Sequence, residues 1–332
     1  MSNPLSRRTL LAASLATAGG AVLASCTSSA PTGNAGTTAP TTRPTTKITI
    51  SLIPILDVAP AYVAQAKGFF TEFGLEVETV LAQGGAAIVP AVVGGSAQIG
   101  FSNNLSLIIA NTRGMPLRVV SAAVASTGKD LQDANTVVAK DPAIRSAADL
   151  VGKRVSTNTS RGIGDAVVSA AVRAAGGDPS TITWVELPFP NVEQAVEIGQ
   201  IDAGWLSAPF ATTAVDHGMR VISTPLTEMT DHVMQVSSYF STDAYVAANP
   251  QVVSSFQGAM AKALAYAKDN PDEVRTILPE FMQISPELAA KVVLPDWPTS
   301  LDRKTFEVFE EVGREAGFVE GTVDLDKLLG GA

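Results

Sequence analysis

Short runs rich in β-branched and apolar residues alternate with helix-forming stretches along the chain after residue 46. In the first part, this pattern predicts strands at 47–53, 75–81 and 99–102 and helices at 59–73, 85–93 and 105–113. A second series predicts strands at 136–139, 154–157, 182–186, 202–205 and 220–222 and helices at 147–150, 163–175, 192–198 and 209–217. Strands that alternate with helices in this way form parallel sheets covered on both faces. The two series therefore predict two α/β lobes.

The last part of the chain is predicted to be mainly helical. Pro250 and Pro271 stand where first helical turns would begin, and the stretch 259–268 is rich in strong helix formers. A helical tail must bury its apolar face, and we expect it to pack on the first lobe.

The first 46 residues differ in composition from the rest. Arg7 and Arg8 precede an uncharged stretch, residues 10 to about 23, that is rich in Ala and Leu. This is the layout of an export signal, and the stretch is too short to span a membrane comfortably. Residues 26–46 are rich in Thr, Ser, Ala, Pro and Gly, which is typical of a flexible tether. We therefore expect a signal peptide at 1–25 and a folded body that works outside the cytoplasm.

The single cysteine closes the export signal. Leu23-Ala24-Ser25-Cys26 resembles the bacterial lipobox, in which the cysteine becomes the lipidated first residue of the mature protein. The alternative is a chance cysteine after an ordinary secretory signal. Residues 6–11 partly match a twin-arginine motif, so the twin-arginine and general secretory routes both stay open. The expected location is the extracytoplasmic face of the cell membrane, with Cys26 as the anchor.

Composition and charge exclude several classes of protein. With 332 residues, 46% of them hydrophobic, the chain can bury a large core, so collagen-like and wholly disordered structures are excluded. The formal net charge is −9 and no basic block stands out, which argues against a nucleic-acid partner. One leader cysteine and two separate histidines, His217 and His232, offer no Cys-rich zinc site, no HExxH motif and no thiol nucleophile in the mature domain. We expect no metal, no cofactor and no catalytic residues.

Four segments, in order, carry a family resemblance. They are KGFFTEFGLEVE at 67–78, GGSAQIGF at 94–101, ADLVGKRV at 148–155, and GQIDAGW at 199–205 followed by Pro209-Phe210. Together they resemble the solute-binding lipoproteins of ABC importers for nitrate, sulfonate, taurine and thiamine precursors, the NMT1-like family. One departure is Gln98, where the family usually has Asp.

The resemblance implies a periplasmic-binding-protein type II fold with two lobes, each a mixed, mostly parallel sheet flanked by helices. Lobe 1 would comprise residues 47–132 plus 236–332 and lobe 2 residues 133–235. Two lobes of this kind would close by hinge motion around one small solute. The resemblance also implies ABC permease and ATPase subunits as partners and a monomeric receptor. An extracytoplasmic sensor without a transporter is the alternative, and an enzyme on the same fold is less favoured.

Candidate ligand contacts follow from a rule about topology. In open α/β sheets, ligands bind beyond the carboxyl ends of strands, where loops and helix N-termini converge. Lobe 1 then contributes Asp57, Gln83, Gly84, Gly85, Ser102, Asn103 and Asn104, and the loop at 158–164 contributes Ser160, Arg161 and Gly162. Trp205 follows a predicted strand, and Tyr239 lies on a return strand between the lobes.

Several of these residues have an ordinary structural alternative. Gln83, Gly84, Gly85, Ser102, Asn103 and Asp57 could serve turns or helix caps, Arg161 could face solvent, and Trp205 could fill the core. Helix N-termini and the Arg161 guanidinium suit an anion. A sulfonate or aromatic carboxylate is therefore the first expectation for the solute, with nitrate, bicarbonate and a neutral pyrimidine as alternatives.

Overall fold

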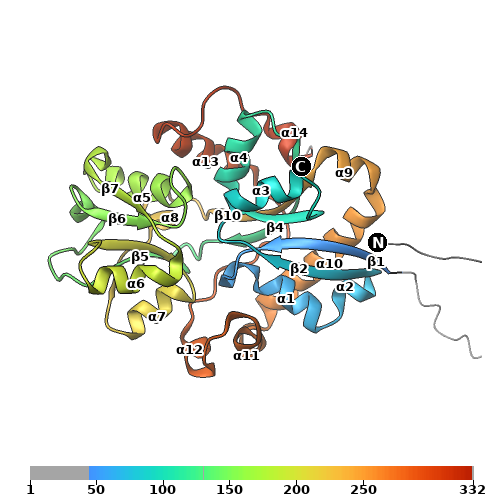
Figure 1. Ribbon diagram of the computed structural model, residues 1–332, viewed down its shortest axis with the longest axis horizontal. Coiled ribbons are helices and arrows are strands. Elements are labelled where there is room, and N and C mark those ends of the chain that lie inside the picture. The colour runs from blue at the N-terminus through green and yellow to red at the C-terminus, as the bar shows by residue number, and fades with distance from the viewer. Residues whose placement is uncertain (1–44, 130, 331–332) are drawn as a thin grey trace, which may run out of the picture. The chain divides into compact units, whose positions relative to one another are not determined.

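The computed structural model describes residues 45–129 and 131–330 (Figure 1). The expected signal peptide, the lipobox with Cys26 and nearly all of the tether lie outside these residues. Within the described ranges the strands form two five-stranded sheets.

The first sheet combines strands from two distant parts of the chain. Its order is β2-β1-β3-β10-β4. The strands are β1 (Thr46–Leu52), β2 (Leu75–Leu81), β3 (Ile99–Asn103), β4 (Leu117–Ala125) and β10 (Gln235–Thr242). β1 pairs in parallel with β2 and β3, whereas β10 pairs antiparallel with β3 and β4. Four strands therefore run one way and β10 runs against them.

The second sheet repeats this arrangement, with the order β7-β6-β8-β5-β9. Its strands are β5 (Asn135–Ala139), β6 (Arg154–Thr157), β7 (Thr183–Glu186), β8 (Ala203–Ser207) and β9 (Arg220–Ser223). β6 pairs in parallel with β7 and β8, and β5 pairs antiparallel with β8 and β9. The expectation of mixed, mostly parallel sheets is confirmed.

Helices of the first series flank the first sheet (Figure 1). They are α1 (Ala59–Ala66), α2 (Phe69–Glu72), α3 (Gly85–Val93) and α4 (Asn104–Thr112), with a 3-10 turn at Leu56–Val58. The expected single helix at 59–73 is wrong, because Gly68 adopts φ +73°. This left-handed conformation ends α1 and lets α2 start in a new direction.

In the second sheet, α6 and α7 lie on one face and α5 and α8 on the other (Figure 1). The helices are α5 (Ile163–Ala174), α6 (Phe189–Glu197), α7 (Phe210–Asp216) and α8 (Pro225–Glu228), with 3-10 turns at Ala147–Leu150 and Pro179–Thr181. α6 starts three residues before the expected 192, with Pro190 in its first turn, where proline loses no hydrogen bond.

The helical tail consists of α9 (Asp243–Ala248), α10 (Pro250–Asp269), α11 (Pro271–Met282), α12 (Pro286–Lys291), α13 (Arg303–Glu315) and α14 (Leu325–Leu329). Pro250 and Pro271 begin their helices, as expected. α10 packs on α1, α2 and β4, and α13 packs on α4, so the tail covers the first sheet as expected. In the part of the chain that the structure describes, no helix has the length and apolar character to cross a membrane.

Two connections join the sheets, one after β4 and one before β10. They are hydrogen-bonded to each other: Ser126 N donates to Met234 O at 2.8 Å, and Met234 N donates to Ser126 Oγ at 3.0 Å. Strands β1–β4 and β10 thus belong to one sheet and β5–β9 to the other. The residue boundaries proposed above for the lobes stay a prediction.

Candidate functional site

A small cavity lies where the ends of strands from both sheets meet. We call it the inner cavity. Its lining comprises Ile53, Ile55, Asp57, Gly85, Phe101, Asn103, Asn135, Asn158, Ile163, Phe189, Trp205, Ser207, Val236 and Ser237. β1, β3, β6 and β8 reach it at or just beyond their carboxyl ends, and the reversed strands β5 and β10 reach it at their amino ends. Its volume is about 30 Å³, far below the roughly 300–1,000 Å³ of typical small-molecule sites.

Asp57 places a carboxyl group in the inner cavity. It lies in the turn after β1 and its side chain is buried, with Oδ1 accepting a long hydrogen bond of 3.4 Å from Ser207 Oγ. Burial raises the pKa of Asp57 to about 7, and the negative charge of Asp133 adds to the effect. The carboxyl group therefore keeps its proton to a much higher pH than an exposed carboxyl group does.

Trp205 forms one aromatic wall of the cavity. It is 3% exposed, and its ring centroid lies 5.7 Å from that of Phe189. Its Nε1 has no hydrogen-bond partner among the described residues. Trp205 therefore packs in the core and also borders the cavity with a free donor.

The start of α3 approaches β3 closely because Gly85 has no side chain. A Cβ at Gly85 would lie 2.3 Å from Ser102 Oγ, a buried oxygen that has no partner among the described residues. A Cβ at Gly84 would lie 2.9 Å from Thr159 Oγ1, in the loop after β6. The two glycines therefore bring the α3 start against both β3 and the second sheet's loop. Gln83 beside them is exposed.

The two asparagines after Ser102 have different positions. Asn103 lines the cavity and caps α4, since its Oδ1 accepts from Ser106 N at 2.8 Å. Asn104 is buried behind it and donates from Nδ2 to Gln235 O at 2.5 Å. Asn103 thus combines the capping role with a place at the cavity.

Carboxylates of the chain itself already use the backbone donors of the loop at 160–162. Ser160 N donates to Glu186 Oε2 at 3.0 Å, and Arg161 N donates to Asp165 Oδ2 at 2.8 Å. The hydrogen bonds from Ser160 lower the pKa of Glu186, whereas burial raises that of Asp165. Negative charge at this helix start is therefore supplied from within the chain. Gly162 forms the N-cap of α5.

The Arg161 side chain contacts the end of α13. Its guanidinium donates to Gly317 O at 2.7 Å and lies 4.8 Å from the centre of the Phe318 ring. Nearby, Arg173 pairs with Glu315 Oε2 at 3.3 Å and donates to Glu315 O at 3.2 Å. One arginine just before α5 and one within α5 thus bind the carbonyl end of α13, where the helix dipole favours cations.

Tyr239 lies inside the first sheet. It is fully buried, with ring contacts to Phe101 at 5.7 Å and to Phe256 at 5.4 Å. Burial raises the pKa of its hydroxyl, which has no hydrogen-bond partner among the described residues. It does not belong to the lining of the inner cavity, and Phe101 stands next to it there.

The cavity therefore unites four of the twelve expected residues: Asp57, Gly85, Asn103 and Trp205. Sequence reasoning missed the polar lining residues Asn135, Ser207 and Ser237 and the aromatic Phe101 and Phe189, whereas Asn158 lies in a loop that the topology rule selects. The sequence signal that could have identified the polar residues is a polar side chain at the end of a strand, whichever way that strand runs. Within the described ranges no group of three or more His, Cys, Asp and Glu side chains is arranged to hold a metal ion.

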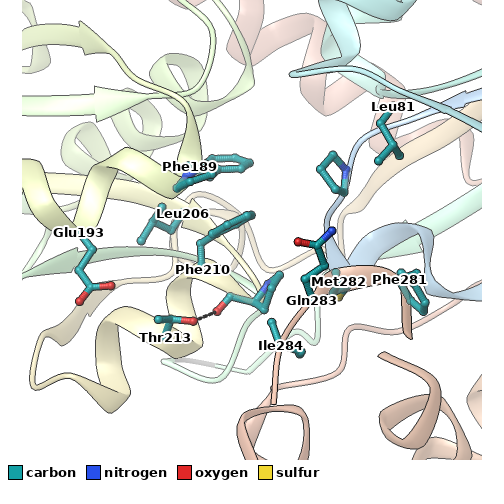
Figure 2. A pocket seen from close by; sticks show the side chains of 13 residues that line it. Leu81, Phe189, Glu193, Leu206, Phe210, Thr213, Phe281, Met282, Gln283 and Ile284 are labelled. Carbon is teal, nitrogen blue, oxygen red and sulfur yellow. Dashed lines mark hydrogen bonds between the residues drawn. The ribbon is translucent and has the colours of Figure 1, made fainter. Parts of the chain in front are cut away.

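A larger pocket of about 490 Å³ lies beside the cavity, and we call it the outer pocket (Figure 2). Its lining comprises Pro54, Leu81, Phe189, Pro190, Glu193, Leu206, Pro209, Phe210, Thr213, Phe281, Met282, Gln283 and Ile284. Figure 2 shows Phe189, Leu206 and Phe210 on one side and Leu81, Gln283 and Phe281 on the other. Phe189 is the residue that lines both spaces.

Comparisons with known proteins agree with this architecture. The model of a family described as NMT1/THI5 like matches residues 56–274. The chain is 24% identical over 233 residues to the formylaminopyrimidine-binding protein of Halalkalibacterium halodurans, covering 65% of this chain and 64% of that protein. It is 26% identical over 263 residues to 4-amino-5-hydroxymethyl-2-methylpyrimidine phosphate synthase of Aspergillus parasiticus, covering 75% and 70%.

Among solved structures, the alkanesulfonate-binding protein SsuA of Xanthomonas axonopodis pv. citri, bound to MOPS, superposes with a TM-score of 0.72. The identity is 16%, and the match covers 86% of this chain and 99% of that one. This likeness supports the periplasmic-binding-protein fold.

Proposed function

Because the chain belongs to the NMT1/THI5-like family, we propose that it is a solute-binding protein that captures one small organic solute between its two sheets and delivers it to an ABC importer. The observation that carries this proposal is the inner cavity, whose lining comes from both sheets. A solute that contacts both sheets stabilises the closed arrangement, because it makes more contacts there than in an open one.

Two solute classes compete within this proposal. Similarity to an alkanesulfonate-binding protein supports the anionic sulfonate or aromatic carboxylate, and similarity to a formylaminopyrimidine-binding protein supports the neutral pyrimidine. The described lining of the inner cavity contains the Asp57 carboxyl group and no Lys or Arg. Buried carboxylates repel anions and attract hydrogen-bond donors. The lining therefore favours a solute that carries donors, with nitrate and bicarbonate disfavoured on the same ground.

The remaining parts of the proposal concern location and partners. We place the protein at the extracytoplasmic face of the membrane, held by lipidated Cys26, with a permease and an ATPase as partners. Cys26→Ser is expected to move the protein from the membrane fraction to the soluble fraction, since one acyl-modified anchor would be lost. Membrane retention of this variant, measured by fractionation and immunoblotting, would contradict the anchor but not the solute-binding role.

A thermal-shift screen of the mature chain tests the function. The panel contains sulfonates, aromatic carboxylates, nitrate, bicarbonate and aminopyrimidines. A solute at 100 times its dissociation constant adds about 2.7 kcal/mol to the free energy of unfolding. We expect a saturable shift with at least one organic solute, recovered unchanged after incubation. Conversion of that solute would favour the enzyme alternative, and shifts by none of the panel would contradict capture of these classes.

Arg161→Ala serves as a second arm of the screen. Because the Arg161 guanidinium contacts Gly317 and Phe318, its loss should weaken every solute to a similar degree. A loss confined to anions would instead support direct contact between Arg161 and the solute.

A further inference from the structure

We infer that the inner cavity and the outer pocket form one binding site for an elongated solute, with a nitrogen-bearing head at Asp57 and an apolar tail that passes Phe189 into the outer pocket. This inference rests on the proposed function and names the chemical class of its solute.

Volume is the first argument. The inner cavity measures about 30 Å³, whereas small-molecule sites generally measure roughly 300–1,000 Å³. The outer pocket, at about 490 Å³, falls within that range. The polar groups that can orient a solute thus lie in one space, and most of the room lies in the other.

The wall between the two spaces is thin. Along the turn after β1, Ile53 and Ile55 line the inner cavity and Pro54 lines the outer pocket. Along the end of β8, Trp205 and Ser207 face inward and Leu206 faces outward, as strand alternation requires. A backbone hydrogen bond of 2.9 Å from Leu56 N to Ala208 O ties the two segments together. Backbone therefore closes part of the wall, and side chains close the rest.

Phe189 is the side chain that stands between the spaces. Its ring centroid lies 5.7 Å from that of Trp205, which lines the inner cavity, and 5.9 Å from that of Phe210, which lines the outer pocket. The three rings form a continuous aromatic row from one space into the other. In the proposed site a change of the Phe189 rotamer at the start of α6 joins the spaces, and the three rings give an apolar tail a surface along its path.

Charge selects the head group. Asp57 lines the inner cavity, and the described linings of both spaces contain no Lys, Arg or His, while Glu193 of the outer pocket is already paired with His217 at 2.6 Å. Asp57 has a single long side-chain hydrogen bond, from Ser207. An amine or amidine would give this carboxylate a charge-assisted partner, and the amides of Asn103, Asn135 and Asn158 could accept or donate beside it.

Three simple compounds test the inference by titration calorimetry on the mature chain: benzylamine, 4-butylbenzylamine and 4-butylbenzoate. We expect 4-butylbenzylamine to bind on the order of 30-fold more tightly than benzylamine, because its butyl group leaves water. We expect it to bind at least roughly 10-fold more tightly than 4-butylbenzoate, because the carboxylate head meets Asp57. Asp57→Asn should weaken both amines by a similar factor.

Two neighbouring residues of β2 provide a matched pair of variants. Leu81, 53% exposed, lines the outer pocket, whereas Val80, 48% exposed, is absent from both linings. Leu81→Trp should fill the pocket and remove most of the advantage of the butyl group, measured as the ratio of the affinities for 4-butylbenzylamine and benzylamine. Val80→Trp should preserve that advantage.

The outcomes separate this inference from the proposed function. An advantage of the butyl group that survives Leu81→Trp would overturn the placement of the tail. Failure of both amines to saturate, with tight binding of 4-butylbenzoate or of a sulfonate from the screen, would overturn the nitrogen head and leave the receptor role intact. Binding by none of these compounds and none of the screened solutes would count against both.

Discussion

Replacing Asp57 by asparagine is expected to raise the free energy of unfolding of the ligand-free protein at pH 8 by up to about 4 kcal/mol and to change it little at pH 4. The pKa of Asp57 is raised from 3.8 to about 7, chiefly by burial. Below pH 3.8 the carboxyl group is protonated in both the folded and the unfolded chain, so it costs nothing. Between pH 3.8 and about 7 the unfolded chain ionises while the folded chain keeps its proton, so stability falls across this window, and the full loss is present above pH 7, where the folded chain holds a buried charge. Asparagine removes that charge at every pH.

Urea unfolding of the wild type and Asp57→Asn at pH 4 and pH 8 measures this effect. Asp231→Asn, which replaces an exposed carboxylate, is the control and should change stability by less than about 0.5 kcal/mol at either pH. A gain of the same size at both pH values would mean that packing, and not charge, is responsible. No gain at pH 8 would contradict the burial of a charged Asp57.

The same substitution should weaken solute binding. A buried carboxylate that lowers stability at neutral pH persists where function needs it, because stability and activity trade against each other at binding sites. A variant that is more stable and binds less would therefore assign Asp57 to recognition. A variant that is more stable and binds equally well would leave the carboxylate without a function.

The regular elements of the fold could be predicted closely from the sequence. β2, α3 and β6 begin and end at the expected residues, because apolar periodicity and turn residues mark both of their ends. The errors have local causes. Gly68 breaks a helix whose apolar pattern continues across it, and Pro190 lies inside the first turn of α6, where we expected a loop.

The candidate site was less predictable, because it depends on strand direction and on distant contacts. Asn135 and Ser237 line the cavity from the amino ends of β5 and β10, and a rule based on carboxyl ends overlooks them. Ser207 was missed because β8 runs two residues past the expected end. The direction of the Arg161 side chain depends on Gly317, 156 residues further along the chain.

The contact between α5 and Trp205 leads to the second prediction of large effect. Gly164 is the second residue of α5, and a Cβ there would lie 2.7 Å from Trp205 Cε3 and 2.4 Å from Thr157 Oγ1. These distances are shorter than any real Cβ contact, so a methyl group forces either the helix start or the indole ring to move. Gly164→Ala is therefore expected to lower the free energy of unfolding by about 2 to 3 kcal/mol.

Solute binding should weaken along with stability, because the Trp205 ring forms a wall of the inner cavity. We expect Gly164→Ala to weaken any solute that enters this cavity by roughly 10-fold, measured by titration calorimetry below the unfolding transition. A double-mutant cycle with Trp205→Leu identifies the cause, since a smaller side chain leaves room for the methyl group. If the clash with Trp205 dominates, Gly164→Ala should cost less than about 1 kcal/mol in the Trp205→Leu background. A cost that is equal in both backgrounds would place the strain at Thr157 instead, and would separate the stability of α5 from the shape of the cavity.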